Sequence, residues 1–220
     1  MFRIDKKTCV VLDLDDTLYP EAAYVESGIN HVSQLVISLY GQDLLAEMKL
    51  WREQGETDFL GRLVQHLRLE MSVKESLLWA YRLHMPCIKL SEDVRTTLCK
   101  LQEKSAALAI LTDGRSISQR LKLKALGLAH LPAYISEEWA GRSKPDPLRF
   151  HQVMQDFLGC TFIYVADNPK KDFLAPNQLG WQTIGVRDAG QNIHTQCKVD
   201  PVCHPGLWID RFSDLEDFIC

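Results

Sequence analysis

The chain has 220 residues, of which 46% are hydrophobic and 25% charged, and its formal net charge is −4 at pH 7. This length accommodates one core domain and a small inserted one. Without a basic stripe or interleaved aromatic residues, the mild acidity argues against nucleic acid as a partner. No apolar run approaches a membrane span, and MFRIDKK lacks the core of a signal peptide, so we expect no membrane contact and a cytoplasmic location.

The first expected strand, residues 8–13, runs straight into an acidic turn in the sequence VVLDLDDTLY. Asp13 and Asp15 lie two residues apart where this strand ends, so both side chains can turn toward one ion. Two converging carboxylates repel each other unless a cation or a shared proton joins them. The pair suits a magnesium-assisted nucleophile and an acid/base group, although a solvated acidic turn would have the same sequence.

Residues 20–88 have the pattern of about four short helices. Apolar residues recur at helical spacing in three stretches, which are Val25, Ile29, Val32, Val36 and Leu39, then Leu60, Leu63, Val64 and Leu67, then Leu77, Leu78 and Tyr81. We interpret these stripes as core and not as a cofactor site.

Beyond residue 88, apolar strands alternate with helical patterns, as in a parallel doubly wound sheet. Strands are expected at 106–112, 133–136, 161–166 and 182–186, with 207–209 as a candidate sixth. Helices are expected at 92–104, 115–126, 146–158 and 170–179.

Polar residues follow these strands at the edge where open α/β sheets bind their ligands. Thr112 ends the second strand, and its hydroxyl and the neighbouring backbone N–H groups could hold a phosphate oxygen. Lys144, in RSKPDP, is expected at the start of a helix whose first turn carries proline. Asp167 follows the strand 161–166, with Asp172 five residues further on. This recurrence at strand ends argues against chance placement.

One late loop, HTQCKVDPVCH, contains four residues that can bind metals. They are His194, Cys197, Cys203 and His204. A zinc site would require tighter, paired spacing, so we interpret the stretch as an ordinary surface loop.

In order along the chain, the four motifs resemble those of the haloacid dehalogenase (HAD) superfamily of phosphohydrolases. The resemblance covers about residues 8–20 and 90–187, and Ala166 departs from it because glycine usually precedes the metal aspartate. It implies a Rossmann-like catalytic core of residues 1–20 and 88–220, with strand order 5-4-1-2-3. It also implies a small all-helical cap of residues 21–87.

The resemblance implies a role for each motif residue. Asp13 would be the nucleophile and Asp15 the acid/base, with Thr112 and Lys144 completing the catalytic set. Thr17, Asp113, Thr112 and Lys144 are the candidates for phosphate binding, with Thr17 also expected to orient Asp15 and Asp113 to shape its turn. Magnesium would be held by Asp13, Asp167 and the backbone carbonyl of Asp15, with Asp172 and Asn168 supporting them. The residues that could face the cleft and select substrate are Tyr19, Glu21, Tyr24, Arg52, Arg62, His66 and Arg82, although for each one taken alone a solvated surface role is favoured.

The expected function is magnesium-dependent hydrolysis of a small phosphorylated metabolite, a sugar phosphate or a nucleoside monophosphate, through an aspartyl phosphate. Asp15 argues against a dehalogenase or a phosphonate-cleaving enzyme, because those family members lack this aspartate. A phosphomutase would use the same pair of aspartates, and a catalytically silent interaction protein could retain the fold. Both alternatives stay open at this point.

Overall fold

The computed structural model describes residues 2–196 and 199–220, which contain a six-stranded parallel sheet. Its strands are β1 (Thr8–Leu12), β2 (Ala107–Thr112), β3 (Ala133–Ile135), β4 (Thr161–Ala166), β5 (Gln182–Val186) and β6 (Leu207–Ile209). The order is β3-β2-β1-β4-β5-β6, with every neighbouring pair parallel. The expected doubly wound class is confirmed, with the expected order read from the opposite edge and β6 added outside β5.

The central strand β1 is buried on both faces because its sequence, TCVVL, has no charged residue. Val10 and Leu12 contribute to one hydrophobic cluster, while Cys9 and Val11 contribute to another across the sheet. The chain therefore leaves the middle of the sheet directly at Asp13.

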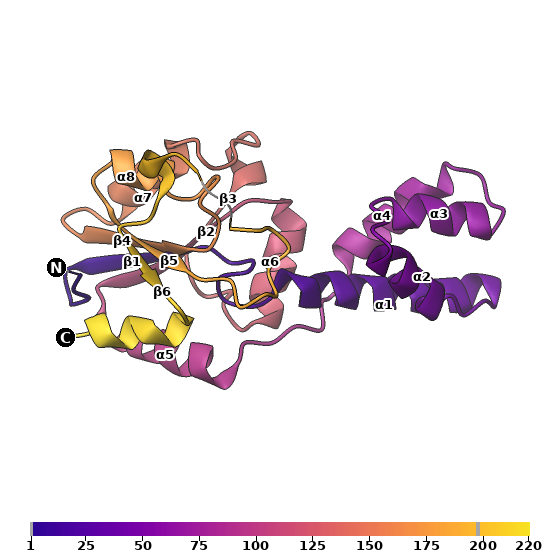
Figure 1. Ribbon diagram of the computed structural model, residues 1–220, viewed down its shortest axis with the longest axis horizontal. Helices are drawn as coiled ribbons and strands as arrows, with labels where there is room; N and C mark the ends of the chain where they lie inside the picture. Colours follow the sequence, from indigo (N-terminus) through magenta and orange to yellow (C-terminus); the bar gives the residue numbers. More distant parts are fainter. Residues whose placement is uncertain (1, 197–198) are drawn as a thin grey trace.

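Helices cover both faces of this sheet (Figure 1). One face is packed by α5 (Glu92–Lys104), α6 (Ser116–Ala125) and the 3-10 helix η3 (Phe212–Phe218). The other face is packed by α7 (Leu148–Asp156) and α8 (Leu174–Gln178). Two further 3-10 turns are η1 (Ser136–Trp139) and η2 (Pro201–Cys203).

Two helices begin later than the sequence pattern predicts. Lys144 lies in the turn before α7 and not at the start of that helix, which begins after Pro147. The last helix, α8, begins at Leu174 instead of residue 170. Its late start follows from the turn after β4, where the Asp172 carboxylate accepts the backbone N–H of Asn168 at 2.8 Å. Both turns keep polar groups at the carboxyl edge of the sheet.

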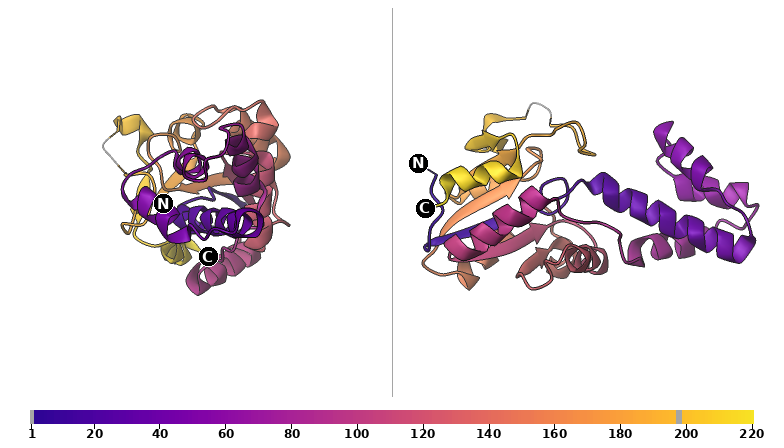
Figure 2. Two further views of the ribbon diagram at one scale, coloured as in Figure 1. Left: turned by 90° about the vertical axis from the view of Figure 1, so that its right-hand side faces the viewer. Right: turned by 90° about the horizontal axis from the view of Figure 1, so that it is seen from below.

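Four helices extend away from the sheet beyond the end of β1, as Figures 1 and 2 show. They are α1 (Glu21–Tyr40), α2 (Leu45–Glu53), α3 (Phe59–His66) and α4 (Val73–Leu83). They share a hydrophobic cluster of their own, which includes Val32, Met48 and Leu63. At 20 residues, α1 is longer than the short helices predicted. The cap boundaries at 21 and 87 stay a prediction. Among the described residues, no helix is long and apolar enough to cross a membrane.

Candidate active site

Asp13 lies at the centre of the carboxyl edge, next to β4. Its backbone N–H donates to the carbonyl of Val165 at 2.9 Å, and its side chain is almost fully buried. The Nζ atom of Lys144 lies 2.9 Å from Oδ1 of Asp13 and 2.6 Å from Oδ1 of Asp172. Burial alone would lower the pKa of Lys144, but the two carboxylates raise it well above its ordinary value. Lys144 is therefore held as a buried cation between two carboxylates.

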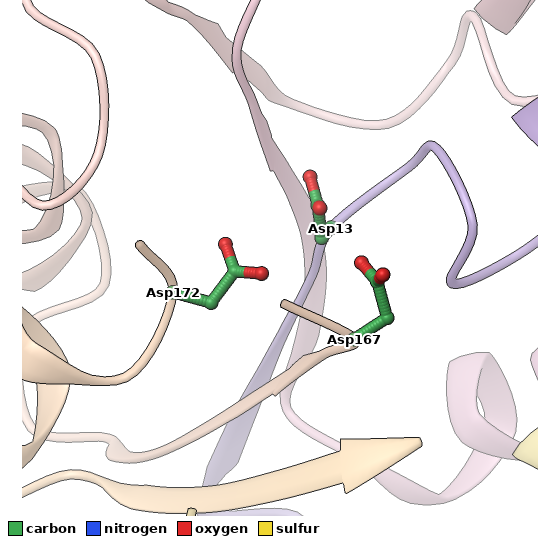
Figure 3. Close-up of side chains that lie close together, drawn as sticks. All are labelled: Asp13, Asp167 and Asp172. Atoms are coloured by element: carbon green, nitrogen blue, oxygen red, sulfur yellow. The ribbon is translucent and has the colours of Figure 1, made fainter. Parts of the chain in front are cut away.

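Three carboxylates turn toward a common space in this region (Figure 3). Asp13, Asp167 and Asp172 each place one oxygen within 4.8 Å of the others. Burial, followed by the charges of Asp13 and Asp172, raises the pKa of Asp167 to about 8. Burial likewise raises the pKa of Asp13, against the effect of Lys144. Lys144 alone does not balance three carboxylates, and a divalent cation with oxygen ligands would.

The three carboxylates differ in the groups that they contact. Oδ1 of Asp172 pairs with Lys144, and its Oδ2 accepts the N–H of Asn168. The side-chain oxygen of Asn168 in turn accepts the N–H of Lys170 at 3.1 Å, which stabilises the turn. Asp172 therefore orients Lys144. The Asp167 carboxylate accepts hydrogen bonds from neutral side chains, Thr17 and Asn192, and makes no ion pair with a described residue, so Asp13 and Asp167 stay the candidate metal ligands.

Within the described residues, three side chains donate to the carboxylate of Asp15. Its Oδ1 accepts hydrogen bonds from the Tyr19 hydroxyl at 2.5 Å and from Nζ of Lys122 at 2.7 Å, and its Oδ2 accepts one from Nε2 of Gln119 at 2.9 Å. Burial alone would raise the pKa of Asp15, but Lys122, Tyr19 and Gln119 hold it below its ordinary value. The hydroxyl of Thr17 donates to Oδ1 of Asp167 at 3.4 Å instead, so the prediction that Thr17 orients Asp15 is wrong.

Sequence reasoning did not find Lys122 and Gln119. Both are buried on the face of α6 that also carries Leu123. Nζ of Lys122 also lies 4.1 Å from the ring centroid of Tyr24 in α1, so the ammonium stands between core and cap. The available signal was the spacing, because positions 119, 122 and 123 share one side of a helix. Polar residues on that apolar side require buried partners.

Replacing Lys122 with methionine is expected to lower the free energy of unfolding by about 1–3 kcal/mol. Removing one partner of a fully buried ion pair costs about 3–5 kcal/mol. The loss expected here is smaller, because the Asp15 side chain is 16% exposed and keeps two further hydrogen bonds. Denaturant unfolding of Lys122→Met, Asp15→Asn and the double variant measures the coupling between the two residues. Strictly additive losses would contradict a stabilising pair.

The carboxylate of Asp113 holds the turn that carries Lys144. Its carboxylate accepts hydrogen bonds from Nη2 of Arg149 at 2.5 Å and from the backbone N–H of Lys144 at 3.1 Å. The fully buried Arg149 also donates to the carbonyl of Thr112 at 2.7 Å. The carboxylate therefore fixes the turn of Lys144 against the end of β2, and phosphate binding by the backbone N–H of Asp113 stays a prediction. The hydroxyl of Thr112, the last residue of β2, lies 3.3 Å from Nε2 of Gln119.

A cavity of about 250 Å³ opens beside Asp15, between core and cap. Three of the cap candidates, Glu21, Tyr24 and Arg82, line this cavity together with Ser118 of α6. Burial and the nearby charge of Asp15 raise the pKa of Glu21 to about 7. The cavity has room for a small polar leaving group.

The remaining cap candidates lie in other places. Tyr19 contacts Asp15 directly, as described above. The Arg62 guanidinium and the His66 ring pack on Trp51, with centroid distances of 4.8 and 5.7 Å. Arg52 lines a separate hollow that Ile193 also borders. Arg62 and His66 therefore belong to the packing of the cap.

Of the late histidine and cysteine residues, the described ones, His194, Cys203 and His204, do not meet the spacing of a metal site. Cys197 lies outside the described residues, so its distance from the others is not defined. Nε2 of His204 lies 3.3 Å from the carbonyl of Val199. In the described part of the chain, the group of side chains that meets the spacing of a metal site is the aspartate cluster.

Residues 10–186 match the sequence profile of the haloacid dehalogenase-like hydrolases. The chain belongs to this family of hydrolases. It is 29% identical to a glyceraldehyde 3-phosphate phosphatase of Methanopyrus kandleri, with 96% of each chain covered. It is 25% identical to a ribulose-1,5-bisphosphate 5-phosphatase of Halopiger xanaduensis, with 80% of this chain and 83% of that one covered.

Solved structures share the fold along nearly the whole chain. A 2-haloacid dehalogenase from Pseudomonas syringae pv. tomato has a TM-score of 0.62 at 20% identity, covering 98% of this chain and 97% of that one. A HAD hydrolase from Bacillus subtilis, bound to magnesium, has a TM-score of 0.64 at 19% identity, covering 98% of each chain. At this level of identity, the likeness concerns the fold.

Proposed function

We propose that this protein is a magnesium-dependent phosphatase that hydrolyses a small phosphate monoester through an aspartyl-phosphate intermediate. The observation that carries the proposal is the buried Lys144 between Asp13 and Asp172, next to Asp167, with Asp15 two residues beyond Asp13 at the mouth of a cavity. The names of the two phosphatases similar to this chain support the same chemistry. A sugar phosphate or a nucleoside monophosphate is the proposed substrate class.

Each residue has a distinct task in this proposal. Asp13 attacks phosphorus and carries the phosphoryl group as an acyl phosphate. Asp13, Asp167 and the backbone carbonyl of Asp15 would hold Mg²⁺, which when bound would neutralise the charge that phosphoryl transfer concentrates on the oxygens. Lys144 and the hydroxyl of Thr112 bind phosphoryl oxygens.

Asp15 transfers protons in both halves of the reaction. It protonates the departing oxygen in the first half and takes a proton from the attacking water in the second. The contacts from Lys122, Tyr19 and Gln119 favour its ionised form, which is the form that acts as the base in the second half. The cavity beside Asp15 supports this role, because a leaving group bound there would lie on the side where the proton is needed.

Release of inorganic phosphate from p-nitrophenyl phosphate tests the proposal. We expect turnover that depends on Mg²⁺ and on Asp13. A phosphomutase would instead convert its substrate without net release of phosphate, and a catalytically silent interaction protein would release none. A screen of sugar phosphates and nucleoside monophosphates would then identify the leaving group.

Removal of divalent metal is expected to reduce phosphate release to background, and added Mg²⁺ is expected to restore it. The reason is that Asp13 and Asp167 offer hard carboxylate oxygens whose repulsion a dication would relieve. The measurement is the rate of phosphate release after dialysis against chelator and after return of Mg²⁺ or Ca²⁺. We expect Ca²⁺ to inhibit, because it prefers more ligands and a looser geometry. Full activity in chelator, with no metal bound, would contradict the mechanism.

A further inference from the structure

The loop of residues 188–196, which follows β5, reaches Asp167 at the carboxyl edge of the sheet. Nδ2 of Asn192 donates to Oδ2 of Asp167 at 2.9 Å. Nε2 of Gln196 donates to the backbone carbonyl of Asp167 at 2.8 Å. This loop therefore binds both the side chain and the backbone of Asp167.

The loop is itself held in place from several sides. Nε2 of Gln196 also donates to the carbonyl of Val186, the last residue of β5, at 2.7 Å, and its Oε1 accepts the N–H of Asp188 at 3.0 Å. The backbone N–H of Ile193 donates to Oδ2 of Asp16 at 2.9 Å, in the turn that follows Asp13. Oδ1 of Asp188 accepts three backbone N–H groups at 2.7–3.0 Å, those of Gly190, Gln191 and Asn192. These hydrogen bonds fix the position of Asn192 relative to Asp167 and to the turn that follows Asp13.

We propose that Asn192 is a positioning residue that orients the Asp167 carboxylate toward Asp13 and thereby raises the affinity of the site for Mg²⁺. This inference rests on the proposed function. Asp13 and Asp172 repel the Asp167 carboxylate, so a fixed donor is needed to keep it facing them. Among the residues that the structure describes, the other side-chain donor to Asp167 is Thr17, which is 3.4 Å away and forms the weaker bond. An uncharged amide donor orients the carboxylate without cancelling the charge that attracts the metal.

The experiment is a calorimetric titration of Mg²⁺ into the full-length, substrate-free protein. For Asn192→Ala we expect the dissociation constant for Mg²⁺ to rise by about tenfold, the lower end of the effect of losing a residue that supports a metal ligand. At saturating Mg²⁺, kcat for p-nitrophenyl phosphate is expected to stay within about twofold of the wild-type value, since Asn192 acts only through Asp167. Asn192→Leu keeps the volume of the side chain without its donor and should reproduce the result if the alanine variant fails to fold.

Gln191→Ala is the matched control. Its backbone N–H bonds to Asp188 in the same loop, and the substitution leaves that bond in place. We expect wild-type affinity for Mg²⁺ from this variant. Unchanged or tighter Mg²⁺ binding by Asn192→Ala would overturn the inference. Tighter binding would mean that the Asn192 amide competes with the metal for Asp167.

The experiment separates a failure of the role assigned to Asn192 from a failure of the proposed function. If the wild-type protein binds Mg²⁺ and hydrolyses the aryl phosphate, but Asn192→Ala matches it in affinity, the inference about Asn192 fails and the proposed function stands. If the wild-type protein neither binds Mg²⁺ nor releases phosphate, the proposed function fails and this inference fails with it.

Discussion

Asp13→Asn is expected to abolish turnover while the protein stays folded. An amide cannot form the acyl phosphate, so we expect kcat for p-nitrophenyl phosphate to fall by roughly 10³-fold or more, the scale on which loss of a nucleophile acts. Asparagine has the same shape as aspartate, and Lys144 keeps its contact with Asp172 at 2.6 Å. The measurement is phosphate release, combined with mass spectrometry of acid-quenched enzyme to detect the phosphorylated aspartate in the wild-type protein.

Asp217→Asn serves as the control for this substitution. Asp217 is exposed in η3, far along the chain from the site motifs, and its replacement removes the same charge. We expect wild-type activity from it and a folded thermal transition from both variants. A phosphorylated peptide that excludes Asp13, or substantial turnover by Asp13→Asn, would assign the nucleophile to another residue.

The strands and motif positions were predictable because they depend on local sequence. Short apolar runs rich in β-branched residues, such as TCVVL and TFIYVA, favour buried strands, and each is followed directly by an aspartate. Parallel strands bring their carboxyl ends to one edge, so the proximity of Asp13 and Asp167 followed from the fold class. The structure adds that one carboxylate oxygen of Asp172 lies within 4.8 Å of carboxylate oxygens of Asp13 and Asp167.

The partners of Asp15 were not predictable in the same way. Lys122 and Gln119 lie on an amphipathic helix, where a polar residue usually faces solvent, and their burial depends on contacts 104 and 107 residues away in sequence. Asn192 lies in a polar loop without periodicity, so no local pattern indicates its bond to Asp167. The expected role of Thr17 failed for a related reason, because a turn at a strand end has several acceptors within reach of one hydroxyl.

Asp15→Asn is expected to slow the first turnover of an alkyl phosphate, such as glycerol 3-phosphate, by about 10²–10⁴-fold, the range that general acid catalysis contributes. The first turnover of p-nitrophenyl phosphate should be slowed much less, because nitrophenolate leaves without a proton. Rapid-quench measurement of the first turnover isolates this half of the reaction. In the second half, the attacking water also loses its base, so p-nitrophenyl phosphate should give a burst of nitrophenol followed by slow release of phosphate.

Tyr19→Phe is the matched control, because it removes one donor to the same carboxylate and leaves Lys122 and Gln119 in contact with it. We expect this variant to show a smaller loss and no accumulation of phosphoenzyme. The ratio of first-turnover losses on the two substrates is the decisive quantity, since misplacement of Asp13 or of the metal by the substitution would slow both substrates alike. Equal losses would therefore assign Asp15 to the architecture of the site, whereas a large excess on the alkyl ester requires a proton delivered from residue 15.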